Sequence, residues 1–479
     1  MKNLGDWQAF EANIVFHASC RLLRYRGETP GPDLATQWSA SPDMKVFTFK
    51  LRPDAKFSDG TAITSSIVAF NLKRSLLYGQ FAELYRNELE EHEKLKTPHD
   101  QFAGVKTPDD HTVVIAFARP VATIMKHLDM LSFSIFHPDD VDLTSDQIKR
   151  DFRACGLYKV VKIGPDEVKM TINKFHWHAA EPRLFPRIRV IPSTSISEAD
   201  RLLSRDIDVI RTLSSAPAYG EMTRRGMSAR TTGPSMSYLS MNFAGPGLKQ
   251  YPRLARDLNI AIDREKLVAF VNSQVGSSYR TAKGVTANIR ALEDHEHSRW
   301  SDSDRLKARA RLRTEYPEVS NGHFPLVLAS IHGNVGEVII AGVRAQLAGV
   351  GLASKAETKE LAEILANNRP GSFSGALVGH GIDAQTPSGA LQFLANSEPT
   401  HTNLPSTHPL FKFYKKLSAV RTYEDHLALV REYNDLNADT GFIIPLFSAE
   451  GKIVFDSRID IAQVPEADNN WRVDDLRMK

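Results

Sequence analysis

Cysteine is scarce in this chain, with only Cys20 and Cys155 among 479 residues. Two cysteines cannot supply a four-cysteine zinc site, nor can they build the several disulfides that hold small secreted domains together. They could still form one bond with each other. The sequence favours two separate, buried thiols.

Long apolar runs are also missing, since no stretch approaches the ~20 consecutive apolar residues that a membrane-spanning helix needs. The first residues, MKNLGDWQAFEANIVF, lack the apolar core and the small-residue cleavage site of a secretory signal. We therefore expect either a cytoplasmic chain or one from which a targeting segment has been removed. The sequence leaves both possibilities open.

Charge of one sign is lacking as well, because 60 basic residues balance 57 acidic ones and leave a formal net charge of +3. Nucleic-acid-binding domains usually carry a basic face or run, and none is visible here, so we expect no nucleic-acid partner. The sequence has no phosphate-binding glycine loop, no His-Glu-x-x-His zinc motif and no recognisable nucleophile with its base. We therefore expect no enzyme, no catalytic residue and no cofactor.

Two histidine pairs come nearest to a metal site. In a strand, histidines spaced two residues apart share one face and could chelate a metal ion. His176 with His178, and His295 with His297, have this spacing, but no third ligand accompanies them in the sequence. We therefore expect solvated side chains and no bound metal.

What the chain does contain is an alternation of helix and strand patterns, over a length that predicts two or three domains. Thr64 is a candidate N-cap for a helix that runs to about Ser75. The other expected helices cover residues 8–24, 83–96, 254–271, 305–316 and 336–351. Within residues 195–210 we expect a helix, capped by Ser195 or Ser197, that leads into a strand. The expected strands cover residues 111–120, 156–163, 167–175, 187–192, 325–330 and 374–380, with a hairpin formed by 156–163 and 167–175. This alternation indicates mixed α/β domains.

Residues 47–60, FTFKLRPDAKFSDG, combine a strand pattern with a group of charges. Phe47 and Phe49 alternate with polar residues, as in a strand that buries one face. Residues 32–76, PDLATQWSASPDMKVFTFKLRPDAKFSDGTAITSSIVAFNLKRSL, resemble the N-terminal signature of the bacterial extracellular solute-binding proteins of family 5. These are receptors that deliver peptides and nickel to ABC transporters. The charges then belong to a scaffold hairpin and not to a catalytic loop.

Further motifs follow in the family's order, so that the resemblance extends from about residue 10 to 460. They are FAGVKTPDDHTVVIAFARP, ACGLYKVVKIGPDEVKMTINKFHW, SYLSMNF with LNIAIDREKLV, GHGIDAQTPSGALQFL, and GFIIPLF. Asp257 stands where the family usually has alanine, which indicates a divergent member. The strand that usually opens the family's first lobe is absent before residue 1, which favours a trimmed start over a native one.

The resemblance implies an α/β protein with the two-lobe fold of periplasmic binding proteins, in which hinge segments join two lobes that are discontinuous in sequence. Lobe I is expected to contain residues 1–240 and 447–479, with residues 26–153 as an inserted subdomain. Lobe II is expected to contain residues 241–446.

The resemblance also implies a ligand site between the lobes. Asp383, in the motif DAQTP, matches the family's carboxylate that binds the ammonium group of a peptide. The structural alternative is that Asp383 caps a helix that begins near Ser388. His380 stands where relatives often have tryptophan; it could stack on a ligand, bind a metal or be a hydrogen-bonded wall residue.

Two aromatic residues complete the expected site. Tyr238 and Phe447 match aromatic residues of the family's pocket wall, although either could be an ordinary core residue. Leu377 falls where oligopeptide-specific relatives have an arginine for the carboxylate end of the ligand. Its presence weakens the expectation of a tripeptide-like ligand.

The implied function is that of the substrate-binding protein of an ABC importer, which closes on a short peptide or peptide-like ligand and docks on a membrane permease. We expect a monomer in the periplasm, or one anchored outside the cell by a lipid. Two alternatives stay open. The chain could be the ligand-sensing domain of a cytoplasmic transcriptional regulator, or it could bind a nickel chelate, an opine or a sugar.

Overall fold

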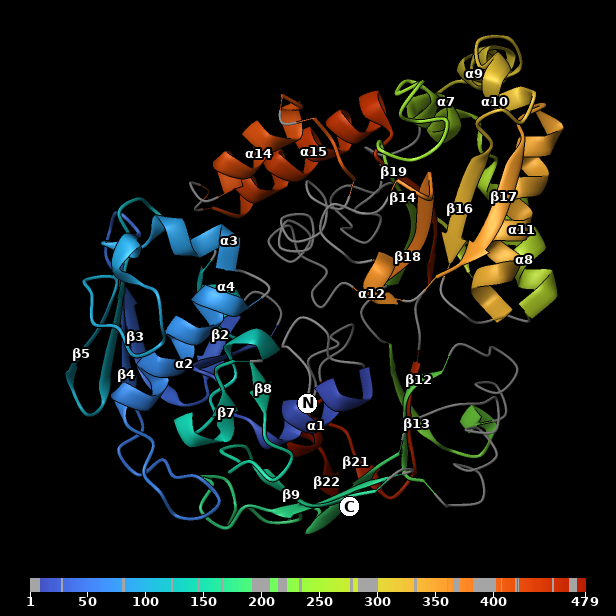
Figure 1. The fold of residues 1–479 in the computed structure, drawn as a ribbon. Coiled ribbons are helices and arrows are strands. Elements are labelled where there is room, and N and C mark those ends of the chain that lie inside the picture. Colours follow the sequence, from blue (N-terminus) through green and yellow to red (C-terminus); the bar gives the residue numbers. More distant parts are fainter. Residues whose placement is uncertain are drawn as a thin grey trace.

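Figure 1 shows the protein as a computed structural model, in which the N-terminal sheets and the large sheet of the second half occupy different parts of the molecule. The helix α1 (Ala9–Ala18), the first described element, lies near the C-terminal end of the chain. The structure describes residues 9–26, 29–79, 82–121, 124–144, 146–164, 167–191, 207–213, 222–231, 235–275, 279–282, 300–330, 334–359, 361–364, 371–381, 402–405, 407–417, 420, 422–449, 452–464 and 472–479.

A four-stranded antiparallel sheet forms the core of the N-terminal part, in the order β3-β4-β6-β5. Its strands are β3 (Ala35–Ala40), β4 (Val46–Leu51), β6 (Thr112–Ala116) and β5 (Val105–Asp109). In β4, Phe47 and Phe49 are fully buried while Lys50 is exposed, which confirms a strand with one buried face. The helix α2 (Ser65–Tyr78) begins directly after Thr64, as predicted, and packs Val68 and Leu72 into the same core.

Two predicted helices end differently from the prediction. The helix expected over residues 8–24 is α1 (Ala9–Ala18), after which the chain turns into the strand β1 (Leu23–Arg26). The charged helix expected over residues 83–96 was wrong, since the chain forms α3 (Ala82–Tyr85), η1 (Arg86–Glu88) and η2 (His92–Lys94). Leu89 and Leu95 are fully buried in the N-terminal core, and the left-handed backbone of Glu91 bends the chain between them. Packing of these leucines therefore overrides the local helical preference.

Several short elements lie beside this core, of which β2 pairs with β1 and the others lead from β6 to the next sheet. They are β2 (Thr29–Pro32), α4 (Ile124–His127), η3 (Leu131–Phe133), η4 (Pro138–Asp140), β7 (Val141–Asp142) and β8 (Gln147–Ile148). The predicted hairpin is confirmed, because β9 (Tyr158–Ile163) and β10 (Val168–Ile172) pair antiparallel. A third strand, β11 (Arg187–Val190), pairs with β10. The helix expected after Ser195 lies outside the described residues, and the strand expected to follow it is confirmed as β12 (Val209–Leu213).

The C-terminal segment returns to the N-terminal part of the chain. The strand β20 (Lys452–Phe455) pairs with both β12 (Val209–Leu213) and β13 (Ser228–Thr231). The last elements are β21 (Ile459–Asp460), η6 (Val473–Asp475) and β22 (Arg477–Met478). Arg24 forms ion pairs with Asp474 and Asp475, and Arg472 forms one with the buried Asp33 at 3.2 Å. These contacts join residues more than 400 positions apart in the sequence.

A six-stranded mixed sheet forms the core of the second half, in the order β15-β19-β14-β18-β16-β17. Its strands are β15 (Arg280–Thr281), β19 (Ile443–Ala449), β14 (Ser235–Met241), β18 (Gly375–Gly381), β16 (Leu326–Ser330) and β17 (Ser354–Thr358). The accompanying helices are α7 (Leu254–Ala261), α8 (Arg264–Val275), α9 (Asp302–Thr314), α10 (Pro317–Ser320), α11 (Asn334–Gly349), α12 (Leu361–Ile364), α14 (Pro409–Leu417) and α15 (Tyr423–Thr440).

Helices cover both faces of this sheet, as Figure 1 shows. One face packs against α7, α8, α9 and α11, and the other packs against α14 and α15. The expected mixed α/β architecture is thus confirmed. The predicted lobe boundaries at residues 240 and 447 fall inside β14 and β19, and the limits of the lobes stay a prediction. Among the described residues, no helix is both long and apolar enough to cross a membrane.

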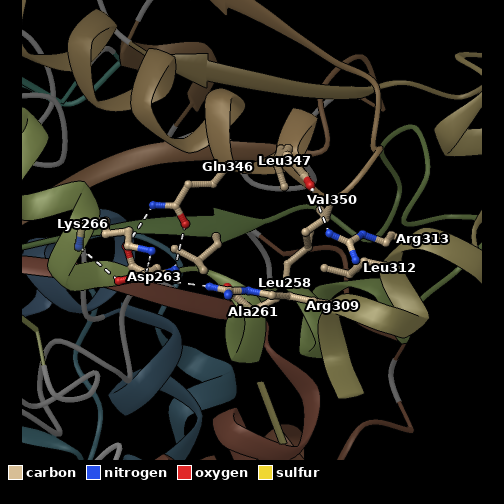
Figure 2. A pocket seen from close by; sticks show the side chains of 12 residues that line it. Leu258, Ala261, Asp263, Lys266, Arg309, Leu312, Arg313, Gln346, Leu347 and Val350 are labelled. Atoms are coloured by element: carbon tan, nitrogen blue, oxygen red, sulfur yellow. Dashed lines mark hydrogen bonds and ion pairs between the residues drawn. The ribbon is translucent and has the colours of Figure 1, made fainter. Parts of the chain in front are cut away.

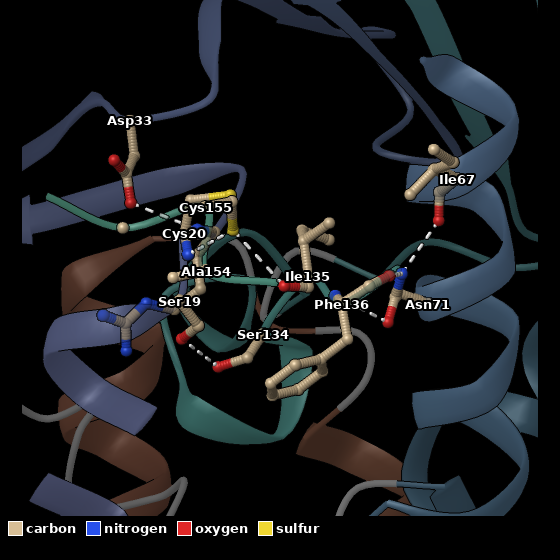
Figure 3. Close-up of a disulfide and its surroundings, with 12 residues drawn as sticks. Ser19, Cys20, Asp33, Ile67, Asn71, Ser134, Ile135, Phe136, Ala154 and Cys155 are labelled. Carbon is tan, nitrogen blue, oxygen red and sulfur yellow. Dashed lines mark hydrogen bonds between the residues drawn. A yellow bond between two sulfur atoms is a disulfide. The ribbon is translucent and has the colours of Figure 1, made fainter. Parts of the chain in front are cut away.

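The two cysteines form a disulfide, so the prediction of two separate thiols was wrong (Figure 3). Their Cα atoms are 5.3 Å apart across a sequence separation of 135 residues. Backbone contacts hold both cysteines in place. Cys20 forms an isolated antiparallel β-bridge with Ile135, and the amide of Gly156, next to Cys155, donates to the carbonyl of Ala18 at 2.9 Å. Such long-range contacts leave no local signal in the sequence.

His127 makes the stability of the N-terminal part sensitive to pH. It is fully buried at the end of α4, where its ring contacts the hydroxyl of Tyr85. Burial, reinforced by the charge of Lys126, lowers the pKa of His127 from 6.5 to about 3. As the pH falls, the unfolded chain therefore takes up this proton near pH 6.5 and the folded chain takes it up only near pH 3. Stability is then lost as the pH falls below 6.5.

We expect His127 alone to lower the free energy of unfolding by about 1.4 kcal/mol per pH unit within this window. Urea unfolding at several pH values between about 7 and 5 measures the slope. The double variant Tyr85→Phe/His127→Phe removes both polar partners together and should lose this part of the slope. An unchanged slope in the double variant would contradict the assignment.

Candidate functional site

Three strands of the six-stranded sheet end side by side where the chain crosses to the sheet of β12, β20 and β13. Ser235, at the start of β14, lies opposite both Gly381 at the end of β18 and Ala449 at the end of β19. Because β14 follows β13 and β19 precedes β20, both connections leave from this end. We call the row Ala449, Ser235 and Gly381 the crossing end.

The segment that carries two of the predicted ligand residues reaches the crossing end. His380 belongs to β18, where its backbone lies opposite Met236. Asp383 lies outside the described residues, but it follows Gly381 by only two positions. The binding roles of both residues stay predictions.

Tyr238 and Phe447 lie in neighbouring strands but on opposite faces of the sheet. Tyr238 is buried with Tyr433 and other residues beneath α14 and α15. Phe447 is buried in the opposite core, with its ring centroid 4.6 Å from that of Tyr279. Ser237 pairs with Phe447, so the next residue, Tyr238, points to the other face. The two rings do not form one wall, and a binding role for either stays a prediction.

Two further side chains near this site bear on the charge of a ligand. Leu377 lies opposite Leu239 and packs against the same core as Phe447, so it supplies no cation. Arg280 is exposed in β15, opposite Ser448 and next to the crossing end. Reasoning from the sequence missed Arg280, because a strand of two residues carries no periodic signal.

The histidine pair at residues 176 and 178 is not a solvated pair, which corrects the expectation. His176 is 7% exposed and stacks on Trp177, with ring centroids 3.9 Å apart. Burial lowers the pKa of His176 to about 3, and His178 contacts Glu181 at 2.5 Å. His295 and His297 lie outside the described residues. In the part of the chain that the structure describes, no three potential metal ligands of the His, Cys, Asp and Glu types gather.

A pocket of about 220 Å³ lies between the ends of α7, α8, α9 and α11 (Figure 2). The basic residues that line it form hydrogen bonds or an ion pair with neighbouring residues of the protein. Arg309 donates to the carbonyl of Ala261 at 3.2 Å, Arg313 donates to that of Gly349 at 3.4 Å, and Lys266 pairs with Asp263 at 3.4 Å. The two arginines thereby bind carbonyls at the C-terminal ends of helices, where a cation is stabilising. We therefore assign no ligand to this pocket.

The family model described as "Bacterial extracellular solute-binding proteins, family 5 Middle" matches residues 29–401. The chain belongs to this family. The resemblance inferred from the sequence motifs is thereby confirmed.

Curated members of family 5 are similar to this chain over different lengths. The periplasmic oligopeptide-binding protein OppA of Salmonella typhimurium is 22% identical over 398 residues, which cover 78% of this chain and 70% of OppA. The probable D,D-dipeptide-binding periplasmic protein DdpA of Escherichia coli is 35% identical over 218 residues. That alignment covers 43% of this chain and only 38% of DdpA.

Solved structures of similar proteins share the fold across nearly the whole chain. OppA of Haemophilus influenzae, in complex with the peptide RPPGFSPFR, has a TM-score of 0.77 at 16% identity and covers 98% of this chain and 94% of its own. The murein tripeptide-binding protein MppA of Escherichia coli has a TM-score of 0.78 at 17% identity, with the same coverage. The expected two-lobe fold of periplasmic binding proteins is confirmed.

Proposed function

We propose that this chain is the substrate-binding protein of an ABC importer and that it binds a short peptide or peptide-like molecule between its two lobes. The family match over residues 29–401 carries the proposal. Relatives described as peptide-binding proteins, and a similar structure that contains a bound peptide, support this class of ligand. We assign the chain a binding role with no catalytic step, and we propose that it acts as a monomer that docks on a membrane permease.

The disulfide supports a location outside the cytoplasm. Disulfides persist in oxidising compartments such as the bacterial periplasm and are rare in the cytoplasm, where thiols are kept reduced. The Cys20–Cys155 bond is buried, with both residues at most 1% exposed. Its position is therefore that of a bond that stabilises the fold, and not that of an exposed redox site. This observation favours a periplasmic or lipid-anchored binding protein over the sensor domain of a cytoplasmic regulator.

We propose that the ligand binds at the crossing end, where the two connections between the lobes leave the large sheet. A peptide can add its backbone to strand edges, which provides affinity without a demand for sequence. Its ammonium group is then available to Asp383. A ligand that contacts both lobes stabilises the closed state only through contacts that the open state lacks. Closure of the hinge would follow from the ligand contacts that only the closed state makes.

A thermal-shift screen tests the ligand class. We expect members of a library of short peptides to raise the melting temperature, because a ligand at 100 times its dissociation constant stabilises the folded state by about 2.7 kcal/mol. Nickel chelates, opines and sugars form the comparison sets. Stabilisation confined to one of these sets would overturn the peptide proposal.

The location has its own test. Cells that produce the protein from its native gene are lysed directly into a denaturant that contains a maleimide, so that buried thiols are blocked as well, and the mass of the protein is measured. We expect no maleimide on either cysteine, because the disulfide is formed in the periplasm. A protein labelled at both Cys20 and Cys155 would favour the cytoplasmic sensor.

A further inference from the structure

Arg264 is a buried cation that binds two parts of the fold at once. It is the first residue of α8 and is 6% exposed. Its Nη1 donates to the carbonyls of Asn259 and Ile262 at 3.0 and 3.2 Å, and its Nη2 donates to Oδ1 of Asn259 at 2.6 Å. Its Nε donates to the carbonyl of Pro445, in β19, at 2.6 Å. The guanidinium thus connects the C-terminal end of α7 to the central part of the sheet.

The Pro445 carbonyl lies next to an irregularity in the pairing of β14 with β19. Tyr238 lies opposite Pro445, whereas the preceding residue, Ser237, lies opposite Phe447. Leu446 is therefore an extra residue, which makes this site a β-bulge. The bulge explains why Leu446 and Phe447, although consecutive, both pack in the core beneath α7 and α8. In a regular strand they would point to opposite faces.

The bulge decides which way the last residues of β19 point. Without it, the pairing would shift by one residue, and the side chains of Phe447 and Ser448 would each turn to the other face. Ala449 is part of the crossing end, and it is separated from Gly381 by only the strand β14. Two strand spacings put these positions about 10 Å apart. A change at the bulge therefore alters the surface next to the crossing end.

The hydrogen-bond acceptors of Arg264 support a role for this residue in holding the bulge. All four of the contacts above are to carbonyl or amide oxygens, which do not neutralise its charge. Burial, together with the charge of Arg305, lowers the pKa of Arg264 to about 9 against the opposing effect of the Asp263 carboxylate, so the guanidinium remains protonated at neutral pH. Burying a charge beside neutral partners is costly, and a branched donor that reaches two elements is what arginine alone provides.

We propose that Arg264 is a positioning residue of the ligand site, which holds the Leu446 bulge and thereby fixes the face on which Phe447 and Ser448 lie next to the crossing end. The part of this proposal that concerns ligand affinity rests on the proposed peptide-binding function. The part that concerns the bulge does not.

The variant Arg264→Met tests the proposal, with Arg309→Met as its matched control. Arg309 also binds a carbonyl at the C-terminal end of α7, that of Ala261, and it pairs with Asp263 at 3.9 Å instead of reaching β19. Hydrogen exchange of the amides of residues 447–449 and calorimetric titration with tri-alanine are measured on both folded variants. We expect Arg264→Met to speed exchange at these amides and to weaken tri-alanine binding by about tenfold or more, equivalent to losing one charged hydrogen bond.

Arg309→Met should lower the melting temperature and leave both readings unchanged. If Arg264→Met fails to fold, Arg264→Lys keeps the charge but reaches only one of the two elements, and the same two readings are expected to change in it. Wild-type exchange and affinity in the folded Arg264 variant would overturn the proposal. If the wild-type protein itself does not bind tri-alanine, the proposed ligand is in doubt, while the exchange measurement still decides the role of Arg264.

Discussion

Replacement of Asp383 by alanine should weaken peptide binding by about several hundredfold, because it leaves the ligand's ammonium group buried without its partner. Losing one member of such a buried pair costs on the order of 3–5 kcal/mol. The position of Asp383, two residues after the crossing end, is compatible with this role. Calorimetric titration of the variant with a peptide identified in the thermal-shift screen measures the loss.

The alternative, that Asp383 only caps a helix, predicts a different result. Asp263 provides the comparison, because its Oδ1 accepts the amide of Lys266 at 3.1 Å at the start of α8, as a helix cap does. Asp263→Ala should cost roughly 1 kcal/mol of stability and leave affinity unchanged. If Asp383→Ala behaves in the same way as Asp263→Ala, the carboxylate is structural, and His380 and Arg280 become the next positions to test.

Removal of the disulfide, in the variant Cys20→Ala/Cys155→Ala, should cost about 5 kcal/mol of stability, because the bond closes a loop of more than a hundred residues. The sequence separation is 135 residues, and the closed loop contains the whole four-stranded sheet with α2. Without the bond, the unfolded chain gains the conformational freedom of that entire loop. The predicted subdomain of residues 26–153 begins and ends just inside the two cysteines, so the loss should appear in the unfolding of that part.

Urea unfolding, followed by hydrogen exchange in the four-stranded sheet, measures this effect. A reducing agent should destabilise the wild-type protein to the level of the double variant and should have no effect on the variant, which has no thiol. A difference of less than about 1 kcal/mol between oxidised wild-type protein and the variant would show that the reduced chain keeps the two segments together by other contacts. The ion pairs of Arg24 and Arg472 are the contacts to examine in that case.

The sequence by itself determined the parts of this protein whose pattern is local. The alternation of Phe47 and Phe49 predicted β4, and Thr64 marked the start of α2. The hairpin of β9 and β10 and the mixed α/β class also followed from periodicity. Family membership could be inferred from motifs in a fixed order, and it implied that Asp383 and His380 belong to the ligand site. Each of these features depends on residues close together in the chain.

Tertiary structure alone decided the features that depend on distant residues. Burial of Leu89 and Leu95 broke the helix predicted over residues 83–96. Packing, not the sequence, brought the two cysteines together. The bulge at Leu446 was not visible either, and with it came the arrangement in which Tyr238 and Phe447 occupy opposite faces.

Asp257 illustrates the same limit. It was visible in the sequence as a departure from the family pattern, but its partners were not. In the structure it is buried, and it accepts hydrogen bonds from the hydroxyl of Tyr316 at 2.7 Å and from Arg311. A buried carboxylate needs such donors, and the chain supplies them more than 50 residues away. Periodicity reports which residues are buried in an element, but only the packed fold determines what each buried group contacts.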